Sequence, residues 1–321
     1  MTSKIALVAA VALVGCAHAV TNTFEDPNGN PTIGSPNSDG GAGLGNGKPT
    51  GNGNSGPTAL FAHSGSTLYQ LDPENLVAPP QTIGDFDCIA QKQGGANSMT
   101  DLAVAKDGTL YGVSEVAAYP LSVQGGTVHC AATWTLPANT RFFGLTVAPE
   151  NTVAATETLI AANGLGQLYM IDPNTGNATQ VGTLGVDSVT GDPWSLSGDI
   201  VFLANGGNPI GFATVRTCGK TGTSTCSTVD TVIQVDVTAI KPGTQSVLKS
   251  VRGQAKSGST TFGSMFGVVA YKDKVIGFSN KGDIVSINNT NGAATLIATV
   301  ANVKFAGAGV STLAPVVAPP H

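Results

Sequence analysis

The stretch SMTDLAVAKDGTLYGVS, residues 98–114, holds two short apolar segments with a tight turn between them. Leu102 and Val104 lie in the first segment, residues 106–108 (Lys-Asp-Gly) make the turn, and residues 109–113 form the second segment. Asp and Gly in a short connection between two apolar runs favour a β-hairpin. We therefore expect two antiparallel strands in this stretch.

Weaker copies of the same hairpin follow along the chain, at residues 142–157, 194–204 and 265–279. A second kind of hairpin, with an Asx/Pro/Gly turn, comes after them, as in residues 167–184. Together the two hairpins make a repeating unit of four strands, A to D. A repeat of this kind predicts a radial or stacked all-β array.

The apolar A strands centre on Leu102, Leu145, Leu196 and Val268. The first unit begins at its B strand, and the missing A strand reappears at the C-terminal end. Closure of a ring by the two chain ends leaves no open sheet edge. We therefore predict a five-bladed β-propeller closed by the C-terminal strand, or a six-bladed one if residues 206–230 hold further strands. The predicted blades are 305–313 with 58–86, 99–136, 143–185, 193–251 and 263–300.

The phrase LYMIDPNTGNATQVGTLG, residues 168–185, resembles a repeat of secreted bacterial β-propellers, LYxIDPxTGxATxVGTLG. The resemblance covers one blade well and the others loosely. It implies the fold but no particular chemistry, because Asp172 and Gly176 are turn residues while Tyr169 and Ile171 suit packing.

The composition excludes some partners. Charged residues are only 11% of the chain and Gly numbers 42, which disfavours helix and favours strands joined by turns. The chain has three arginines, Arg141, Arg216 and Arg252. So few arginines argue against a surface that grips phosphates, and we expect no nucleic-acid partner.

The N-terminus carries an export signal. Lys4 precedes an apolar run, residues 5–14, that is too short to span a bilayer and is typical of a signal peptide. The run ends in Leu-Val-Gly-Cys at residues 13–16, which resembles the bacterial lipobox. The resemblance implies a signal peptide over 1–15, lipidation of Cys16 and a membrane anchor, and Ala17 after the cysteine implies the outer membrane. The alternative is ordinary secretion, with cleavage after the A-x-A pattern at 17–19.

The remaining boundaries follow from composition. Residues 16–56 are rich in Gly, Asn and Pro and predict a flexible tether, since they cannot bury enough apolar surface to order themselves. Residues 57–314 would form the propeller and residues 315–321 a disordered tail.

Four cysteines remain beside Cys16, an even number in an exported chain, so two disulfides are expected. Cys218 and Cys226 bracket a short loop that closes easily, and Cys88 would then pair with Cys130. No metal or other cofactor is predicted.

The connections between strands suggest a binding face. The long ones, residues 87–98, 206–230 and 252–262, all fall on the face that carries the B–C and D–A connections. Long insertions on one face of a repeat protein are typical of its binding surface. We expect a protein or a glycan to bind there.

Residues near the start of the A strands are the candidate ligand-binding set at the mouth of a central channel. Asp101, Arg141 and Asp192 could bind polar groups, and Phe142 and Trp194 could stack on a sugar or side chain. The chain lacks the motifs G-x-S-x-G and H-E-x-x-H, so no catalytic residue is assigned. We therefore expect a non-catalytic interaction module; the alternatives are a lactonase- or lyase-like propeller enzyme and a structural subunit of an envelope complex.

Overall fold

The computed structural model describes residues 59–89, 98–137, 141–219 and 226–316, all of which belong to the unit Gly40–His321. The predicted signal peptide, Cys16 and the tether at residues 16–56 lie outside the described residues. The described part is all-β, with 23 strands and two short 3-10 segments, Asn205–Gly207 and Val237–Ala239. None of its helical segments is long and apolar enough to cross a membrane.

The strands pair into one nine-stranded sheet, three four-stranded sheets and one two-stranded sheet. For description we divide the nine-stranded sheet into two groups, units I and II, and call the four-stranded sheets units III to V in chain order. Unit I consists of β23 (Gly307–Val310), β1 (Leu60–His63), β2 (Thr67–Leu71) and β3 (Gln81–Phe86). Unit II consists of β4 (Met99–Val104), β5 (Leu110–Ser114), β6 (Ala117–Gln124) and β7 (Thr127–Cys130). The short strand β8 (Trp134–Thr135) pairs with β6. Unit III is β9 (Phe142–Ala148), β10 (Thr158–Asn163), β11 (Gln167–Ile171) and β12 (Ala178–Thr183). Unit IV consists of β13 (Trp194–Leu203), β14 (Ile210–Thr217), β15 (Thr231–Val235) and β16 (Leu248–Gln254). Unit V consists of β19 (Met265–Tyr271), β20 (Lys274–Ser279), β21 (Asp283–Asn288) and β22 (Ala294–Thr299). A small hairpin, β17 (Lys256–Ser257) and β18 (Thr260–Thr261), lies between units IV and V.

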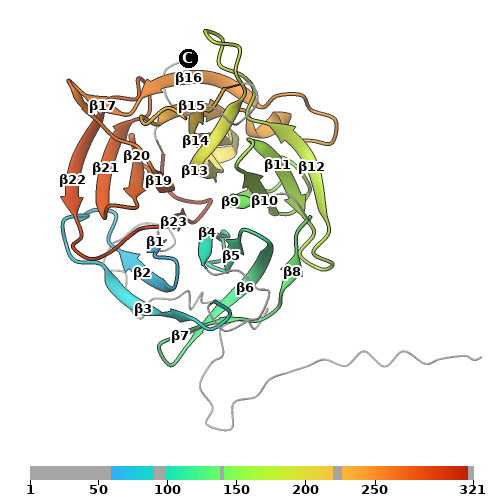
Figure 1. Cartoon of the computed structure of the whole chain (residues 1–321). Coiled ribbons are helices and arrows are strands. Elements are labelled where there is room, and N and C mark those ends of the chain that lie inside the picture. The colour runs from blue at the N-terminus through green and yellow to red at the C-terminus, as the bar shows by residue number, and fades with distance from the viewer. Residues whose placement is uncertain (1–58, 90–97, 138–140, 220–225, 317–321) are drawn as a thin grey trace, which may run out of the picture. The chain divides into compact units, whose positions relative to one another are not determined.

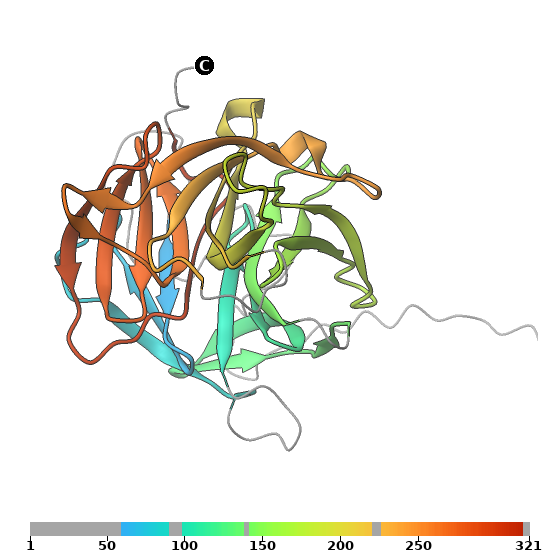
Figure 2. The same ribbon diagram turned by 45° about the horizontal axis from the view of Figure 1, so that its top comes forward.

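Burial falls from the first strand of a unit to the last, and the sequence follows it. Inner strands such as β13 are buried at nearly every position, whereas the outer strand β22 is mostly exposed or half-buried. Inner strands are therefore mainly apolar, as in Ile200–Leu203 of β13, and outer strands such as β12 and β22 contain more Thr and Gln. Figures 1 and 2 show the units following one another around a common centre, with the inner strands toward it.

The two ends of the described chain meet in unit I. Strand β1 pairs antiparallel with β23, with His63 opposite Gly307 and Leu60 opposite Val310. The C-terminal strand thus supplies the missing first strand, as the sequence predicts. Units I and II are further joined at their outer edges, where β3 pairs in parallel with β7.

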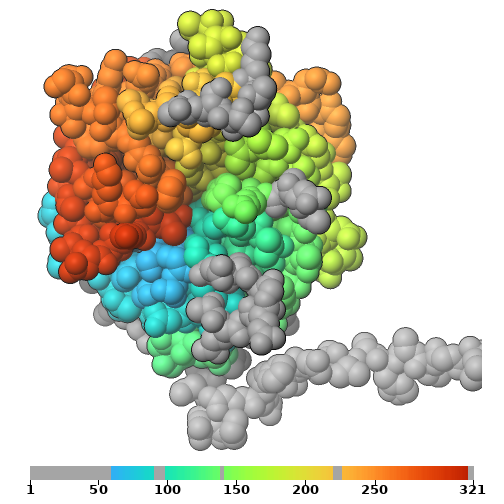
Figure 3. All heavy atoms as spheres, viewed as in Figure 1, coloured from blue at the N-terminus to red at the C-terminus, as the bar shows by residue number. Residues whose placement is uncertain are grey.

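The inner strands contact one another in a closed series, β23 to β4, β4 to β9, β9 to β13, β13 to β19 and β19 back to β23. Glycine permits this close approach: a Cβ on Gly267 would lie 2.6 Å from the carbonyl carbon of Gly307. In Figure 3 the coloured atoms of neighbouring units meet at the centre of the face. The centre of the molecule is therefore packed.

Two details of unit IV differ from the prediction. Residues 194–204 were expected to form a hairpin, but Trp194–Leu203 is one strand with a bulge between Leu196 and Ile200. The turn does not form because Gly198 packs against the backbone of Met265 and the side chain of Asp199 is buried. Residues 206–230 are not one connection either, because they contain strand β14 of the same unit.

Loop lengths separate the two faces less clearly than expected. Residues 236–247, 149–157 and 72–80 are also long connections, and they lie on the face opposite residues 255–262. At the C-terminal end, Pro315 accepts a hydrogen bond from the Lys272 amide at 2.6 Å, and Val316 is bridged to Lys272. These two residues, expected in the tail, contact unit V.

Candidate functional site

The centre of the molecule contains a carboxyl group that joins three units. Asp101 is fully buried on β4. Its Oδ2 accepts a hydrogen bond from the amide of Leu145 on β9 at 2.5 Å, and its Oδ1 accepts one from the amide of Ala308 on β23 at 3.3 Å. Asp101 therefore holds units I, II and III together at their inner strands.

A second buried carboxyl group, Asp199, performs the same task on the other side of the centre. Its Oδ1 accepts from the amide of Ile200 in the bulge of β13, and its Oδ2 accepts from the amide of Val268 on β19 at 2.6 Å. The bulge turns Asp199 inward, so this carboxyl group links units IV and V.

The two carboxyl groups interact directly with each other. Burial raises the pKa of Asp101 well above its ordinary value, and the charge of Asp199 and a hydrogen bond to Asp199 raise it further. Burial also raises the pKa of Asp199, although the hydrogen bond from Asp101 opposes this rise. A proton shared between the two groups avoids two adjacent buried negative charges.

His63 lies beside this pair. It is fully buried on β1, and its Nδ1 lies 2.7 Å from the carbonyl oxygen of Ser64. Burial lowers the pKa of His63 to about 4. Within the described chain, its Nε2 has no hydrogen-bond partner. A Cβ on Gly307 would lie 2.2 Å from His63 Nε2 and 2.6 Å from Asp101 Oδ1, so both atoms pack closely against this glycine and leave no room for a side chain there.

A third buried carboxyl group, Asp230, lies at the start of β15. It accepts hydrogen bonds from Ser197 Oγ and, at 2.9 Å, from the amide of Met265. Burial raises the pKa of Asp230, while these hydrogen bonds and the charge of Arg216 lower it. Asp230 therefore joins units IV and V a short way from Asp199.

The five residues predicted to bind a ligand do not form one site. Asp101 and Phe142 are fully buried, and Trp194 is 5% exposed. Phe142 packs edge-on against Tyr169 at a centroid distance of 5.3 Å. Arg141 is at the surface, 3.7 Å from Glu115, and Asp192 is half-buried. Phe142 and Trp194 therefore serve the core rather than presenting a face for stacking.

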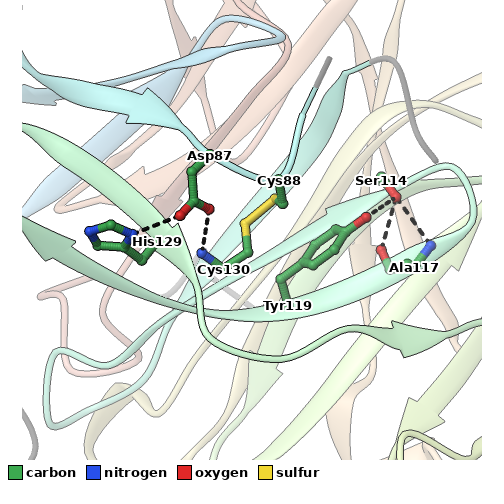
Figure 4. Close-up of a disulfide and its surroundings, with 7 residues drawn as sticks. All are labelled: Asp87, Cys88, Ser114, Ala117, Tyr119, His129 and Cys130. Carbon is green, nitrogen blue, oxygen red and sulfur yellow. Dashed lines mark hydrogen bonds and ion pairs between the residues drawn. A yellow bond between two sulfur atoms is a disulfide. The ribbon is translucent and has the colours of Figure 1, made fainter. Parts of the chain in front are cut away.

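The structure contains the two expected disulfides, Cys88–Cys130 and Cys218–Cys226, with Cα–Cα distances of 5.7 and 3.9 Å. Cys88–Cys130 joins units I and II next to the β3–β7 pair (Figure 4). Beside it, Asp87 accepts from the amide of Cys130 at 3.0 Å and lies 2.7 Å from His129 Nδ1. The same close-up shows Tyr119 and Ser114, whose hydroxyl oxygens are 3.2 Å apart.

One group of potential metal-ligand atoms within 4.8 Å of one another occurs in the described residues, and it consists of Asp87, Cys88 and Cys130. Both of its sulfur atoms belong to the disulfide. Cysteine binds a metal as a thiolate, so neither sulfur atom of this group can be a thiolate ligand while the disulfide is intact.

Exposed aliphatic side chains gather on the connections of unit III. Leu165, in the turn between β10 and β11, is 64% exposed, while Val186 and Val189, between β12 and β13, are 52% and 89% exposed. The two connections are tied together by a hydrogen bond from the amide of Leu184 to Gly166 at 2.8 Å. We call Leu165, Val186 and Val189 the aliphatic patch.

The loop that carries Val189 is held in shape by Asp187. Its carboxyl group accepts from the amide of Val189 at 3.2 Å and from Thr190 Oγ1 at 3.0 Å, and its backbone pairs with Gly191 and Asp192. Val189 is therefore presented to solvent by an ordered turn.

The opposite face has a groove of about 290 Å³ between units I and V. At its rim, Glu74 accepts hydrogen bonds from Tyr271 at 2.6 Å and from Lys272 at 2.9 Å. Desolvation, and then the hydrogen bond to Glu74 and the charge of that carboxylate, raise the pKa of Tyr271 to about 12. The groove is thus spanned by a polar bridge between the first and last units.

Asp199 was not among the predicted site residues, because residues 194–204 were expected to form a hairpin. His63 was not among them either, since nothing in the sequence places this residue beside Asp101. The sequence does contain one indication of the role of Asp199. It is the only charged residue among residues 196–203, which are otherwise mostly apolar, and a charged residue that is buried needs a hydrogen-bond partner.

No protein-family model matches the chain, and no curated protein matches it. A similar chain among solved structures is described as "Crystal structure of BBS1N in complex with ARL6DN, soaked with mercury", with a TM-score of 0.36 and 10% sequence identity. The match covers 72% of this chain and 58% of that chain.

Proposed function

We propose that the chain is a five-bladed β-propeller, closed by β23, that acts outside the cytoplasm as a non-catalytic module for binding a protein. Units I to V are the blades in this proposal, and Cys16 carries the lipid that anchors the chain to the outer membrane. The observation that carries the binding role is the aliphatic patch, which an ordered turn presents to solvent.

The chemistry of the patch favours a protein partner over a glycan. Leu165, Val186 and Val189 offer aliphatic surface, which suits the apolar core of a protein interface. Sugar recognition would use exposed aromatic rings, and Phe142 and Trp194 are buried. A protein is therefore the partner that we propose.

The burial of the central carboxyl groups favours a non-catalytic role over a propeller enzyme. Asp101 and Asp199 are fully buried, and their oxygens accept backbone amides of neighbouring units. A substrate could reach them only if the inner strands separated. Their contacts suit the joining of blades.

Site-specific photocrosslinking in the producing cell tests the binding surface. A photoreactive amino acid replaces Val189 in one variant and Val77 in the matched control. Val77 is 68% exposed and lies on the opposite face, between β2 and β3. We expect a discrete protein adduct from position 189 and none from position 77.

Equal adducts at both positions, or an adduct at position 77 alone, would contradict the proposed surface. An adduct with one stoichiometric partner that copurifies through several steps would point to a structural subunit of an envelope complex, whereas a weakly held partner would point to a receptor.

The lipid anchor is tested separately. A Cys16→Ser variant should incorporate no labelled palmitate and should leave the membrane fraction, whereas the wild-type chain should be labelled. Labelling that persists in Cys16→Ser would overturn the lipidation.

A further inference from the structure

The outer edge of unit V differs from the outer edges of the other units. Strand β22 (Ala294–Thr299) is the last strand of its sheet, and among the described strands it pairs with β21 alone. Figure 1 shows it at the outer margin of the molecule. In an edge strand, alternate residues direct their amide and carbonyl groups away from the neighbouring strand, where these groups can pair with a further strand.

The outer edges of the other units are covered or charged. Strands β3 and β7 pair with each other. The edge of β12 is covered by the connection before β16, because the amide of Lys241 donates to the carbonyl group of Val181 at 3.1 Å. In the same connection, the amide of Val247 donates to Thr183 at 2.8 Å. Strand β16 carries the exposed Lys249. Covering and charge are the usual means by which proteins prevent a sheet edge from pairing.

Strand β22 has neither protection along its length. Its sequence, Ala-Thr-Leu-Ile-Ala-Thr, contains no charged residue and no proline, and Leu296 is 49% exposed. The register with β21 is regular on either side of a bulge at Ile297. Among the described residues, no segment other than β21 forms a hydrogen bond with the backbone of β22. This edge is therefore open to a further strand.

Lysine side chains lie at both ends of the open edge. Lys256 is bridged to Ala293, just before β22. Lys281 precedes Gly282, whose carbonyl oxygen accepts the amide of Val300, just after β22, at 2.8 Å. Both lysines are exposed, and within the described residues neither forms a salt bridge. The two ends of the edge therefore carry positive charge without a counter-charge.

The surroundings of the edge are basic as well. Residues 237–321 contain eight basic side chains and two acidic ones, Asp273 and Asp283. Asp283 lies near Lys281, but its carboxyl group accepts a hydrogen bond from Thr299 Oγ1 at 2.7 Å. An incoming carboxylate therefore meets an attractive field on this side of the molecule.

The open backbone and the lysines together select one kind of occupant. Unpaired amide and carbonyl groups match an extended chain, and the lysines match carboxylates. We infer that β22 is a docking edge for an extended acidic segment of a partner protein, which adds to unit V as a further strand with carboxylates beside Lys256 and Lys281. Six residues of a strand span about 20 Å, so the acidic residues of the segment would be separated by about that distance.

A second copy of this chain is a poorer occupant of the edge. If two β22 strands paired antiparallel, Lys256 of each copy would approach Lys281 of the other. Parallel pairing would place each lysine beside its own equivalent. Like charges directly opposite each other on paired strands are destabilising. The lysines therefore discourage self-association and leave the edge open to an acidic strand.

Binding of synthetic peptides to the full chain tests the inference by fluorescence anisotropy. The probe is the fluorescein-labelled peptide Glu-Glu-Thr-Val-Thr-Val-Thr-Val-Glu-Glu. One matched peptide has Lys in place of every Glu, and another keeps Glu but is N-methylated at alternate residues, which removes the amide donors. We expect the probe to bind at least about tenfold more tightly than either matched peptide.

Each result of this comparison has a definite meaning. A probe that does not bind would overturn the docking edge. Equal binding of the lysine peptide would overturn the role of charge, and equal binding of the N-methylated peptide would overturn the addition of a strand.

Charge reversal at the two ends of the edge tests its position. Lys256→Glu/Lys281→Glu should weaken binding of the acidic probe by at least about tenfold and strengthen binding of the lysine peptide. The matched control is Lys241→Glu/Lys249→Glu, which makes the same change in net charge at exposed positions of unit IV. It should bind the probe within about twofold of the wild type, and an equal loss in both variants would overturn the assigned site.

Hydrogen–deuterium exchange measured by mass spectrometry locates the bound strand. The acidic probe should slow exchange in Ala294–Thr299 and leave β12 unchanged, because the edge of β12 is already covered. Protection elsewhere without protection of β22 would overturn the inference. So would a dimer of the free chain in gel filtration with β22 already protected, since a second copy would then occupy the edge. The aliphatic patch belongs to unit III and takes no part in these measurements, so this inference and the proposed function can fail independently.

Discussion

The carboxyl group of Asp101 on β4 accepts the amide hydrogen of Leu145 on β9, 44 residues further along the chain. The same side chain accepts the amide of Ala308 on β23, 207 residues away. One buried carboxyl group therefore replaces strand pairing between inner strands that belong to different units.

Asp101→Ala should lower the free energy of unfolding by about 2–4 kcal/mol, because two buried amides lose their acceptor. Urea denaturation followed by circular dichroism measures the change. Asp192→Ala is the control, since it changes an aspartate outside the core, in the connection before β13, and should stay within about 0.5 kcal/mol of the wild type. Similar effects of the two substitutions would show that Asp101 does not hold the units together.

The two disulfides should contribute unequally. Cys88–Cys130 closes a loop with a separation of 42 residues and Cys218–Cys226 one of 8. Chain entropy then predicts losses of about 4 and about 2.6 kcal/mol when the pairs are replaced by alanine. Thermal unfolding of the two double variants tests the order, and a larger loss from Cys218→Ala/Cys226→Ala would contradict it.

Gly198→Ala should destabilise the chain by about 3 kcal/mol, because the new Cβ would lie 2.0 Å from the carbonyl oxygen of Met265 and the backbone cannot move aside cheaply. Gly164→Ala is the control, since its Cβ would meet only the ring of Phe143 at 3.1 Å. Chemical denaturation compares the two variants. Equal losses would argue against close packing of β13 on β19.

Asp230 should make stability depend on pH. Its pKa is raised in the folded state, so the folded chain binds more protons than the unfolded one and this contribution is lost as pH rises from about 4 through the folded pKa. Asp230→Asn should therefore cost most at pH 4 and progressively less toward pH 8, as measured by urea denaturation at each pH.

Ser197→Ala is the control for this experiment. It removes a hydrogen bond that lowers the pKa of Asp230 but keeps the titrating group, so its stability should still fall as pH rises, over a range that extends to higher pH than in the wild type. A cost of Asp230→Asn that is constant with pH, or that grows with pH, would contradict the assigned direction.

The strands of units I, II, III and V could be predicted because their signals are local. Apolar runs and turn residues such as Asp107-Gly108 act between neighbours in the chain. The closure of unit I was also predictable, since one strand was missing at one end of the array and one was left over at the other. The pairing of the cysteines followed from their spacing.

Unit IV was harder to predict for a physical reason. Ser197-Gly198-Asp199 has the composition of a turn, but Gly198 is required by the backbone of β19 and Asp199 by the amide of Val268. Tertiary contacts override a local preference of about 1 kcal/mol when they satisfy buried groups.

The sequence by itself determined the class of fold, the order of the strands and the cysteine pairs. These features depend on the spacing of apolar residues, on the residue types in the turns and on the lengths of the loops, all of which can be read along the chain. Only the tertiary structure decided which charged residues meet at the centre. His63, Asp101 and Asp199 come together because inner strands from different units approach across glycines, and the distances between residues of separate units are not written in any local pattern.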